Sequence, residues 1–332
     1  MSDSQSSPSP AALLAPLVAI VGPTASGKSS LGVWLAERLN GEILACDSTQ
    51  VYRGFDVGTA KPSAGERREV PHHLLDLLEP HELFTAGEYR KRAIVVLDDL
   101  RGRGRLPVLT VGTGLYLRAL LEGLADAPLR SEDLRKRLLR RTERNRPGYL
   151  HRLLARMDPV AAERIGPHDA PKLVRAIEVC ILAGKPMTEV HRGGQQRLPG
   201  FRPIKIGLNP PRTALYERIE SRTIAMVERG WLDEVKALVG QGISNDAKPF
   251  LFIGYRELRE HLEGTKILPA AIVAIQQATR RYAKRQLTWF RKESDVRWFE
   301  GFGDDAGVAD SALHYLQMEL FAPGSAAAGS RM

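Results

Sequence analysis

The chain has 332 residues, a formal net charge of +9 and a sequence pI near 9.7. Its length allows one large domain or two modest ones with a substantial core, and its basic balance favours partners that carry phosphate, such as nucleic acid, nucleotide or acidic membrane. The two cysteines, Cys46 and Cys180, lie far apart and form no CxxC pair, which argues against a disulfide framework and a zinc site and favours a reducing compartment.

The N-terminal segment contains no targeting or membrane-spanning signal. The apolar run at 13–21 is too short to cross a bilayer, and the Ser- and Pro-rich stretch before it has no Lys or Arg. We predict a disordered tail at 1–15, and the end of a helix followed by a second disordered tail at 313–332. We therefore expect a cytoplasmic protein without a membrane partner.

Apolar runs that fit buried parallel strands alternate with helical patterns in the first part of the chain. A helix with leucines at four-residue spacing follows the first strand, and Thr85 with Glu88 has the spacing of a capping box at the start of another helix. The strands are expected at 16–21, 42–46, 73–78 and 107–111.

The pattern changes in the middle of the chain. Residues 130–175 show helical patches rich in arginine and no convincing strand, whereas strand character returns at 203–208 and 296–299. We predict a catalytic core formed by residues 16–127 and 190–312, interrupted by a helical, arginine-rich insertion domain at 128–189.

The strongest motif fits G-x-x-x-x-G-K-[ST] and lies between a predicted strand and a predicted helix, as a P-loop must. Its backbone N–H groups and the helix N-terminus suit phosphate oxygens, Lys28 can neutralise the outer phosphate, and the Ser29 hydroxyl is placed to hold Mg²⁺. The residues predicted to bind phosphate are Gly22, Pro23, Thr24, Ala25, Ser26, Gly27, Lys28 and Ser29. The fold class predicted is therefore α/β, with a P-loop NTPase-like doubly wound parallel sheet.

Two further motifs follow predicted strands. Asp47 ends the strand at 42–46, at the edge of an open α/β sheet where ligands bind, and it could act as a general base, hold Mg²⁺ or only cap a turn. The glycine-rich run at 112–114 closes the strand at 107–111 at the same edge.

Seven motifs occur in a fixed order between residues 18 and 292: GPTASGKS, DSTQVYRGFDVGTAKP, PHHLLDLLEP, VGTGLYLRALLEGL, RAIEV, FIGYREL and TRRYAKRQLTWFRK. In content and order this series resembles bacterial tRNA dimethylallyltransferases, the tRNA isopentenyltransferase or IPP transferase family. The chain departs from the family pattern at Val111, where glycine is usual, and at His168, where asparagine is usual.

The resemblance implies a prenyltransferase. It would move the dimethylallyl group from dimethylallyl diphosphate to the exocyclic N6 amine of the tRNA adenosine immediately 3′ of the anticodon, after that base has left its loop. The products would be N6-isopentenyladenosine and diphosphate. The resemblance implies three catalytic residues: Asp47 receives the amine proton, Thr24 reaches the bridging oxygen and Arg222 adds charge at the diphosphate. Mg²⁺ at Ser29 would be the cofactor.

The resemblance also implies that the insertion and the basic helix at 279–292 contact the anticodon stem-loop, with an affinity that falls as salt rises. No protein partner is evident, and we expect a monomer. The residues expected to contact tRNA are Asp47, Ser48, Thr49, Gln50, Thr113, Arg135, Pro171, Lys172, Leu173, Val174, Arg175, Leu251, Phe252, Ile253, Gly254, Tyr255, Arg256, Arg280, Arg281, Lys284 and Arg285.

The alternative from the residues alone is a nucleotide or small-molecule kinase, with ATP on the P-loop and Asp47 as base for an acceptor hydroxyl. A weaker alternative is a non-catalytic RNA-binding switch, but the chain has no guanine-reading N/TKxD motif. A kinase leaves the arginine-rich insertion and the basic helix at 279–292 without a role.

Overall fold

The structure is a computed structural model that describes residues 14–192 and 196–321. It divides into a core unit, Met1–Leu121 with Gly200–Met332, and a helical unit, Glu122–Pro199. The helical unit therefore extends several residues beyond both ends of the predicted insertion at 128–189. Residues 1–13 and 322–332, predicted as tails, lie outside the described residues, and Ala15 already belongs to a strand.

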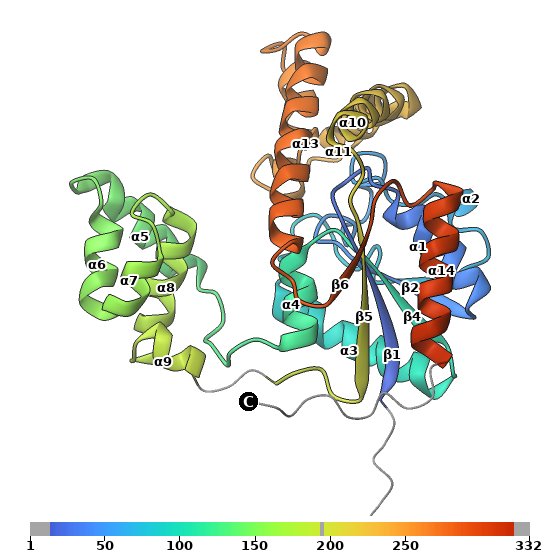
Figure 1. The fold of residues 1–332 in the computed structure, drawn as a ribbon. Helices are drawn as coiled ribbons and strands as arrows, with labels where there is room; N and C mark the ends of the chain where they lie inside the picture. Colours follow the sequence, from blue (N-terminus) through green and yellow to red (C-terminus); the bar gives the residue numbers. More distant parts are fainter. Residues whose placement is uncertain (1–13, 193–195, 322–332) are drawn as a thin grey trace, which may run out of the picture. The chain divides into compact units, whose positions relative to one another are not determined.

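The core unit is built on a six-stranded sheet with the order β3-β2-β4-β1-β5-β6 (Figure 1). All five neighbouring pairs are parallel, and the central strand β1 pairs with β4 on one side and β5 on the other. The strands are β1 (Ala15–Val21), β2 (Gly41–Cys46), β3 (His72–His73), β4 (Leu106–Val111), β5 (Phe201–Leu208) and β6 (Val296–Phe299). The predicted fold class, a P-loop NTPase-like doubly wound parallel sheet, is confirmed.

Helices cover both faces of this sheet, which explains why its central strands are apolar on both sides. Figure 1 shows α1 and α14 on one side and α3 and α4 on the other. Leu31 and Leu35 of α1 pack with Val18, Val108 and other strand residues in one buried cluster. The covering helices are α1 (Lys28–Arg38), α3 (Ala86–Gly102), α4 (Gly114–Glu122) and α14 (Ala306–Phe321), and α2 (Ala64–Arg67) is a single turn.

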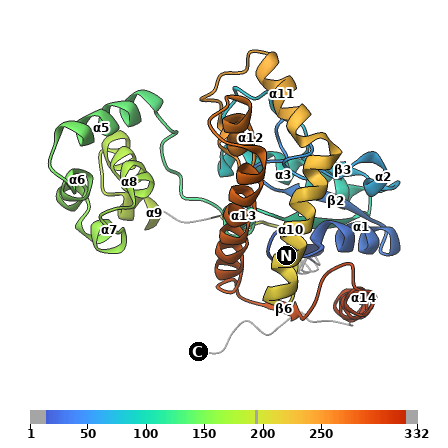
Figure 2. The same cartoon turned by 90° about the horizontal axis from the view of Figure 1, so that it is seen from above.

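A second group of helices lies beyond the carboxyl ends of the strands. In this group α13 packs against α10 and α12, as Figure 2 shows from above. The group comprises α10 (Arg212–Met226), the π-helical turn η1 (Val227–Trp231), α11 (Leu232–Gly240), the 3-10 turn η2 (Lys248–Leu251), α12 (Tyr255–Leu262) and α13 (Leu268–Phe290). No helix among the described residues has the length and apolar character needed to span a membrane.

The predicted strand at 73–78 is wrong in extent. The β3 strand ends at His73 because Leu74 and Asp76 take positive φ values of 66° and 52°, which a strand does not accommodate. Only Leu78 returns to the ladder, through an isolated parallel bridge to Tyr52. Only half of the predicted capping box is present: the Thr85 side chain accepts a hydrogen bond from the Glu88 N–H at the start of α3, whereas the Glu88 carboxylate binds Arg92.

The helical unit has its own apolar core, in which Leu138, Leu154 and Ile177 are buried. Beside this core the Glu178 carboxylate is fully buried and binds two arginines, Arg135 and Arg175, which joins α5 to α8. The unit contains α5 (Glu132–Arg144), α6 (Tyr149–Met157), α7 (Pro159–Arg164), α8 (Ala170–Ala183) and α9 (Met187–Arg192). Its described residues form no strand, as the sequence predicts.

Candidate active site

The P-loop leaves the end of β1 and enters α1, and it is pressed against the loop that precedes α14. Gly27 has φ +86°, and a Cβ there would lie 2.6 Å from Asp304 Oδ1 and 2.7 Å from the Gly303 nitrogen. The Gly303 N–H donates to the Ser26 carbonyl at 2.9 Å. Glycine is therefore required at position 27 both for its left-handed backbone and for the close approach of the second loop.

Lys28 is held inside the P-loop. Its Nζ donates to the Gly22 carbonyl at 3.0 Å and to the Pro23 carbonyl at 2.7 Å. Removal from water lowers the pKa of Lys28 to about 7; the Asp47 charge acts in the opposite direction and the Arg222 charge lowers the pKa further. Even with the Asp47 carboxylate nearby, this ammonium is close to its point of deprotonation at neutral pH.

The P-loop forms one wall of a cavity of about 550 Å³. Four cationic side chains, Lys28, Arg68, Arg218 and Arg222, line it together with the carboxylates of Asp47, Glu66 and Asp304. Arg222 makes no hydrogen bond or ion pair within the described part of the chain, whereas Arg218 donates to Asp304 at 2.6 Å. A pocket with backbone N–H groups and several cations suits an anion such as a diphosphate.

Asp47 faces the P-loop from the carboxyl end of β2, as predicted. Its Oδ1 accepts hydrogen bonds from the Thr49 N–H at 2.8 Å and from the Thr49 hydroxyl at 2.7 Å. A Cβ at Gly112 would lie only 1.9 Å from Asp47 Oδ2, so the glycine makes room for the carboxylate. Asp47 is therefore fixed on one oxygen, and Oδ2 packs against the end of β4.

A second cavity, of about 360 Å³, adjoins the first. Thr24, Asp47, Arg222 and Tyr282 line both cavities, so the two meet at the P-loop and the end of β2. The apolar side chains that line only the second cavity are Ile219, Met226, Trp231, Leu251, Phe252, Ile253 and Ile275. The arrangement joins a cationic, phosphate-binding compartment to a largely apolar one.

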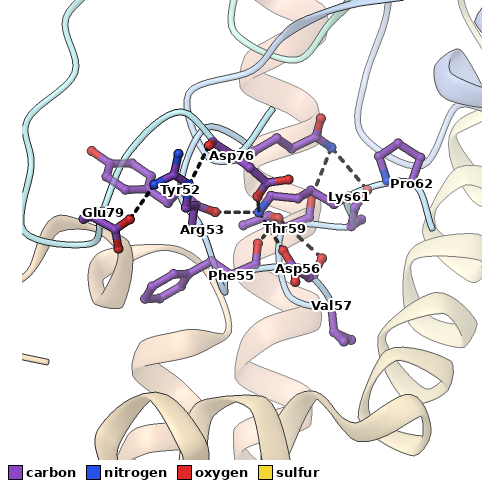
Figure 3. Close-up of polar contacts among 12 residues, drawn as sticks. Tyr52, Arg53, Phe55, Asp56, Val57, Thr59, Lys61, Pro62, Asp76 and Glu79 are labelled. Carbon is purple, nitrogen blue, oxygen red and sulfur yellow. Dashed lines mark hydrogen bonds and ion pairs between the residues drawn. The ribbon is translucent and has the colours of Figure 1, made fainter. Parts of the chain in front are cut away.

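Residues of the segment 50–62 line both cavities. The polar contacts of a buried lysine hold this segment in shape, as Figure 3 shows. Lys61 Nζ donates to the Tyr52 carbonyl and to the carboxylates of Asp56 and Asp76. Gln50 Nε2 donates to the carbonyls of Thr59 and the next residue at 3.3 and 3.2 Å. The Lys61 side chain is 3% exposed, so it acts within the fold and does not face the cavities.

Two residues of the site, Tyr282 and Gln286, were not singled out from the sequence. Both lie on α13 and bind the Gly112 carbonyl, at 3.1 Å from the Tyr282 hydroxyl and 2.8 Å from Gln286 Nε2. Gln286 is buried on this helix, whereas its apolar neighbour Leu287 is half-buried. The helix also begins at Leu268, well before the predicted start at 279.

Many of the residues expected to contact tRNA gather around the second cavity. Ser48 lines this cavity and is joined to Thr113, which lies outside the cavity lining, by hydrogen bonds through the Thr113 hydroxyl. Gln50 lines only the first cavity. Those lining the second cavity are Asp47, Ser48, Thr49, Leu251, Phe252, Ile253 and Arg285.

Other expected contacts in the core unit have protein partners. Gly254 and Tyr255 are buried, and the Tyr255 hydroxyl donates to Glu234 at 2.6 Å. Arg280 is paired with Glu220. The side chains of Arg256, Arg281 and Lys284 are exposed on their helices. The roles of all these residues toward RNA stay predictions.

In the helical unit, the expected contacts fall into two groups. Leu173 and Val174 are buried in its core, and Arg135 and Arg175 bind Glu178, so these four side chains have structural partners. The remaining two, Pro171 and Lys172, are exposed at the start of α8, where Lys172 pairs with Asp169 at 2.5 Å. A contact with tRNA from this segment stays a prediction.

The oxygen-rich surroundings of the P-loop fit Mg²⁺ only together with a bound phosphate. Ser29 and Asp47 line the first cavity and offer a hydroxyl and a carboxylate, the hard ligands that Mg²⁺ prefers. Across residues 14–192 and 196–321, no cluster of three or more His, Cys, Asp or Glu side chains could hold a metal ion. A magnesium ion here would take its other ligands from phosphate and water, as it usually does.

The chain matches the family model described as IPP transferase over residues 50–293. It is 52% identical over 301 residues to a protein of Koribacter versatilis named tRNA dimethylallyltransferase, covering 91% of this chain and 98% of the relative. A protein of Solibacter usitatus with the same name is 49% identical over 298 residues, covering 90% of this chain and 97% of the relative.

Solved structures with a similar fold include the full-length tRNA isopentenylpyrophosphate transferase of Bacillus halodurans. That protein is 39% identical, with a TM-score of 0.68 over 92% of this chain and 96% of that one. A eukaryotic dimethylallyltransferase, described as acting on tRNA, is 26% identical, with a TM-score of 0.77 over 92% of this chain and 78% of that one.

Proposed function

The chain belongs to the IPP transferase family, and on that premise we propose that it transfers the dimethylallyl group of dimethylallyl diphosphate to tRNA. The acceptor is the exocyclic N6 amine of the adenosine immediately 3′ of the anticodon. The products are N6-isopentenyladenosine and diphosphate. The relatives, whose names state this transfer to tRNA, cover nearly the whole chain.

The observation that carries the proposal is the junction of the two cavities. The cationic compartment behind Thr24 suits the diphosphate of the donor, and the apolar compartment beyond it suits a prenyl chain and a planar base. The two compartments meet at Asp47, which lines both cavities. A donor whose charged and apolar ends differ so strongly would be oriented by this division alone.

In the reaction, the N6 amine of the adenine attacks the allylic carbon, and the bond from that carbon to the bridging oxygen breaks. The amine loses one proton, which Asp47 accepts, and the electron pair of the broken bond leaves with the diphosphate. Thr24 borders both cavities, where it can reach the bridging oxygen. No phosphoryl group is transferred, so the P-loop stabilises a leaving group.

The P-loop and the cationic side chains that line the first cavity would stabilise the negative charge of the diphosphate. Lys28 must turn from the Gly22 and Pro23 carbonyls to the outer phosphate, and Arg222 already faces the cavity without another partner in the described residues. The Ser26 hydroxyl, buried and without a partner there, is a further donor for a phosphate oxygen. We propose Mg²⁺ as cofactor, held by Ser29 and the diphosphate, where it would neutralise developing charge.

The acceptor tRNA is bound, in this proposal, by the residues around the second cavity and by the exposed basic residues of α13. Arg281, Lys284 and Arg285 are exposed on that helix, which suits contacts to backbone phosphates. We further propose that the enzyme works as a monomer in the cytoplasm, where its tRNA substrate is found.

The kinase alternative is not favoured. A kinase would use the same P-loop but would transfer a phosphoryl group, and relatives at 49–52% identity over about nine-tenths of the chain are named tRNA dimethylallyltransferases.

Nucleoside mass spectrometry tests the proposal. An unmodified tRNA with adenosine 3′ of its anticodon is incubated with the enzyme, Mg²⁺ and dimethylallyl diphosphate, and N6-isopentenyladenosine is expected in the digest. Asp47→Asn, which cannot accept the proton, should slow transfer by about 10²- to 10⁴-fold. No product with the natural enzyme, or phosphoryl transfer from ATP instead, would overturn the proposal.

A further inference from the structure

We infer that Gln286 is a positioning residue that sets the P-loop relative to the proton-accepting side of the site. Gln286 lies on α13 and is 6% exposed. Its Oε1 accepts a hydrogen bond from the Thr24 N–H at 2.7 Å, and its Nε2 donates to the Gly112 carbonyl at 2.8 Å. One amide therefore joins the loop after β1 to the end of β4.

The orientation of this amide is dictated by its partners. A backbone N–H can only donate and a carbonyl can only accept, so the oxygen must face Thr24 and the nitrogen must face Gly112. A buried amide with both groups satisfied is costly to disturb, because loss of its oxygen leaves the Thr24 N–H without a partner among the described residues. Gln286 thus defines one arrangement of the two segments.

The two backbone groups that Gln286 binds serve different parts of the reaction, departure of the diphosphate and removal of the amine proton. Thr24 lies in the loop that binds the donor, and Gly112 packs against Asp47, with the position of a Cβ only 1.9 Å from Oδ2. The bridge through Gln286 therefore sets the distance between the leaving group and the proton acceptor. Displacement of reacting groups by about 1 Å can cost about 10²-fold in rate.

The bridge should affect the rate of transfer more than donor binding. The Thr24 N–H is occupied by Gln286, so it does not serve a phosphate oxygen, and diphosphate binding is left to the later N–H groups of the loop, Lys28 and Arg222. The Gly112 carbonyl keeps a second donor, the Tyr282 hydroxyl at 3.1 Å, when Gln286 is replaced. The Thr24 N–H has no such substitute within the described residues.

The inference rests on the proposed function, and Gln286→Met tests it. Methionine keeps the length of the side chain and removes both hydrogen bonds. We expect the single-turnover rate of prenyl transfer, at saturating donor and tRNA, to fall by about 10²-fold. The dissociation constant for dimethylallyl diphosphate, measured by calorimetry, should change by less than about threefold. Gln277→Met, the same substitution at an exposed position of α13, is the matched control and should leave both values unchanged.

A second variant separates positioning from simple packing. In Gln286→Glu a protonated carboxyl restores both a donor and an acceptor, whereas the carboxylate cannot donate to Gly112. The rate of this variant, divided by that of the natural enzyme at the same pH, should rise as pH falls. A ratio independent of pH would overturn the inference.

Three further outcomes decide the question. A Gln286→Met rate within threefold of the natural enzyme, or a donor affinity that falls in proportion to the rate, would also overturn the positioning role. Failure of the natural enzyme to modify tRNA at all would instead overturn the proposed function, and this inference would fall with it.

Discussion

At the scale of single residues, Lys28 connects donor binding to protonation. Burial lowers its pKa to about 7 in the free enzyme, so the ammonium is progressively lost as pH rises above that value. A diphosphate beside it favours the charged form and raises the pKa. Binding above pH 7 must therefore take up a proton, and the apparent affinity must fall as pH increases.

We expect the dissociation constant for dimethylallyl diphosphate to rise between pH 7 and pH 9, by at most about tenfold per pH unit. Calorimetry in buffers with different ionisation enthalpies would measure the proton uptake directly. Lys28→Arg, whose guanidinium stays charged, binds more weakly but should lose this pH dependence, which separates it from ionisation of the donor itself. Equal slopes for Lys28→Arg and the natural enzyme would contradict the prediction.

The P-loop and Asp47 could be predicted from the sequence because their chemistry is tied to local spacing. Eight consecutive residues specify the P-loop, and Asp47 follows an apolar strand directly. Gln286 has no such signature, since a glutamine on a helix is usually exposed. Its partners, Thr24 and Gly112, are separated from it by 262 and 174 residues, so only the fold brings them together.

At the scale of elements, the turn between β2 and β3 is fixed from outside by α11. The Glu234 carboxylate accepts the N–H groups of Asp56 at 2.9 Å, Val57 at 2.7 Å and Gly58 at 3.2 Å, and it accepts the Tyr255 hydroxyl as well. Burial, reinforced by the Glu234 charge, raises the pKa of Tyr255, which keeps that hydroxyl a donor.

Glu234→Gln should destabilise the protein by about 1–3 kcal/mol, because an amide nitrogen then faces backbone donors that lose their acceptor. Urea unfolding monitored by circular dichroism would measure the change. Glu228→Gln, an exposed position in the preceding π-helical turn, is the matched control and should shift the unfolding free energy by less than about 0.5 kcal/mol. Equal effects of the two substitutions would show that the turn does not depend on Glu234.

The helices at the edge of the sheet were less predictable than the strands. Apolar runs fix the strands because both sides of a parallel sheet are covered, and β1, β2 and β4 begin within one residue of the predicted starts. The start of α13 has an isoleucine in its N-cap position and no side-chain cap, so its one start signal is the proline in its first turn, Pro269. The strand predicted at 73–78 ends early because Leu74 takes a positive φ, a local conformation that the apolar pattern does not indicate.

At the scale of the whole molecule, the arginine-rich insertion is a separately packed unit whose charges are partly internal. Arg135 and Arg175 both bind Glu178, and the Ser131 N–H binds the same carboxylate at 2.8 Å. The family resemblance implies that Arg135 and Arg175 contact tRNA, a role that stays a prediction, and the structure gives both side chains an interior partner. Composition predicts a basic surface, but it does not tell which cations are already paired.

Glu178 offers a test of how independent the two units are. Burial alone would raise the pKa of Glu178, but hydrogen bonds from Arg135 and Arg175 lower it to about 2. Its contribution to stability is therefore present above the unfolded pKa of about 4.3 and is lost as pH falls through the folded value. Glu178→Ala leaves partly buried arginines without their acceptor, which typically costs about 3–5 kcal/mol.

Because the helical unit has its own core, we expect this loss to stay within it. Hydrogen exchange of Glu178→Ala should show reduced protection in peptides from 130–190 and unchanged protection in β1 and the P-loop.

Dimethylallyl diphosphate with Mg²⁺ should still raise the melting temperature of the core unit in Glu178→Ala, and by more than ATP does. Glu163→Ala, exposed on α7, should leave the exchange pattern as it is. Loss of protection that spreads to β1, or loss of the donor effect, would mean that the core unit depends on the helical unit for its own stability.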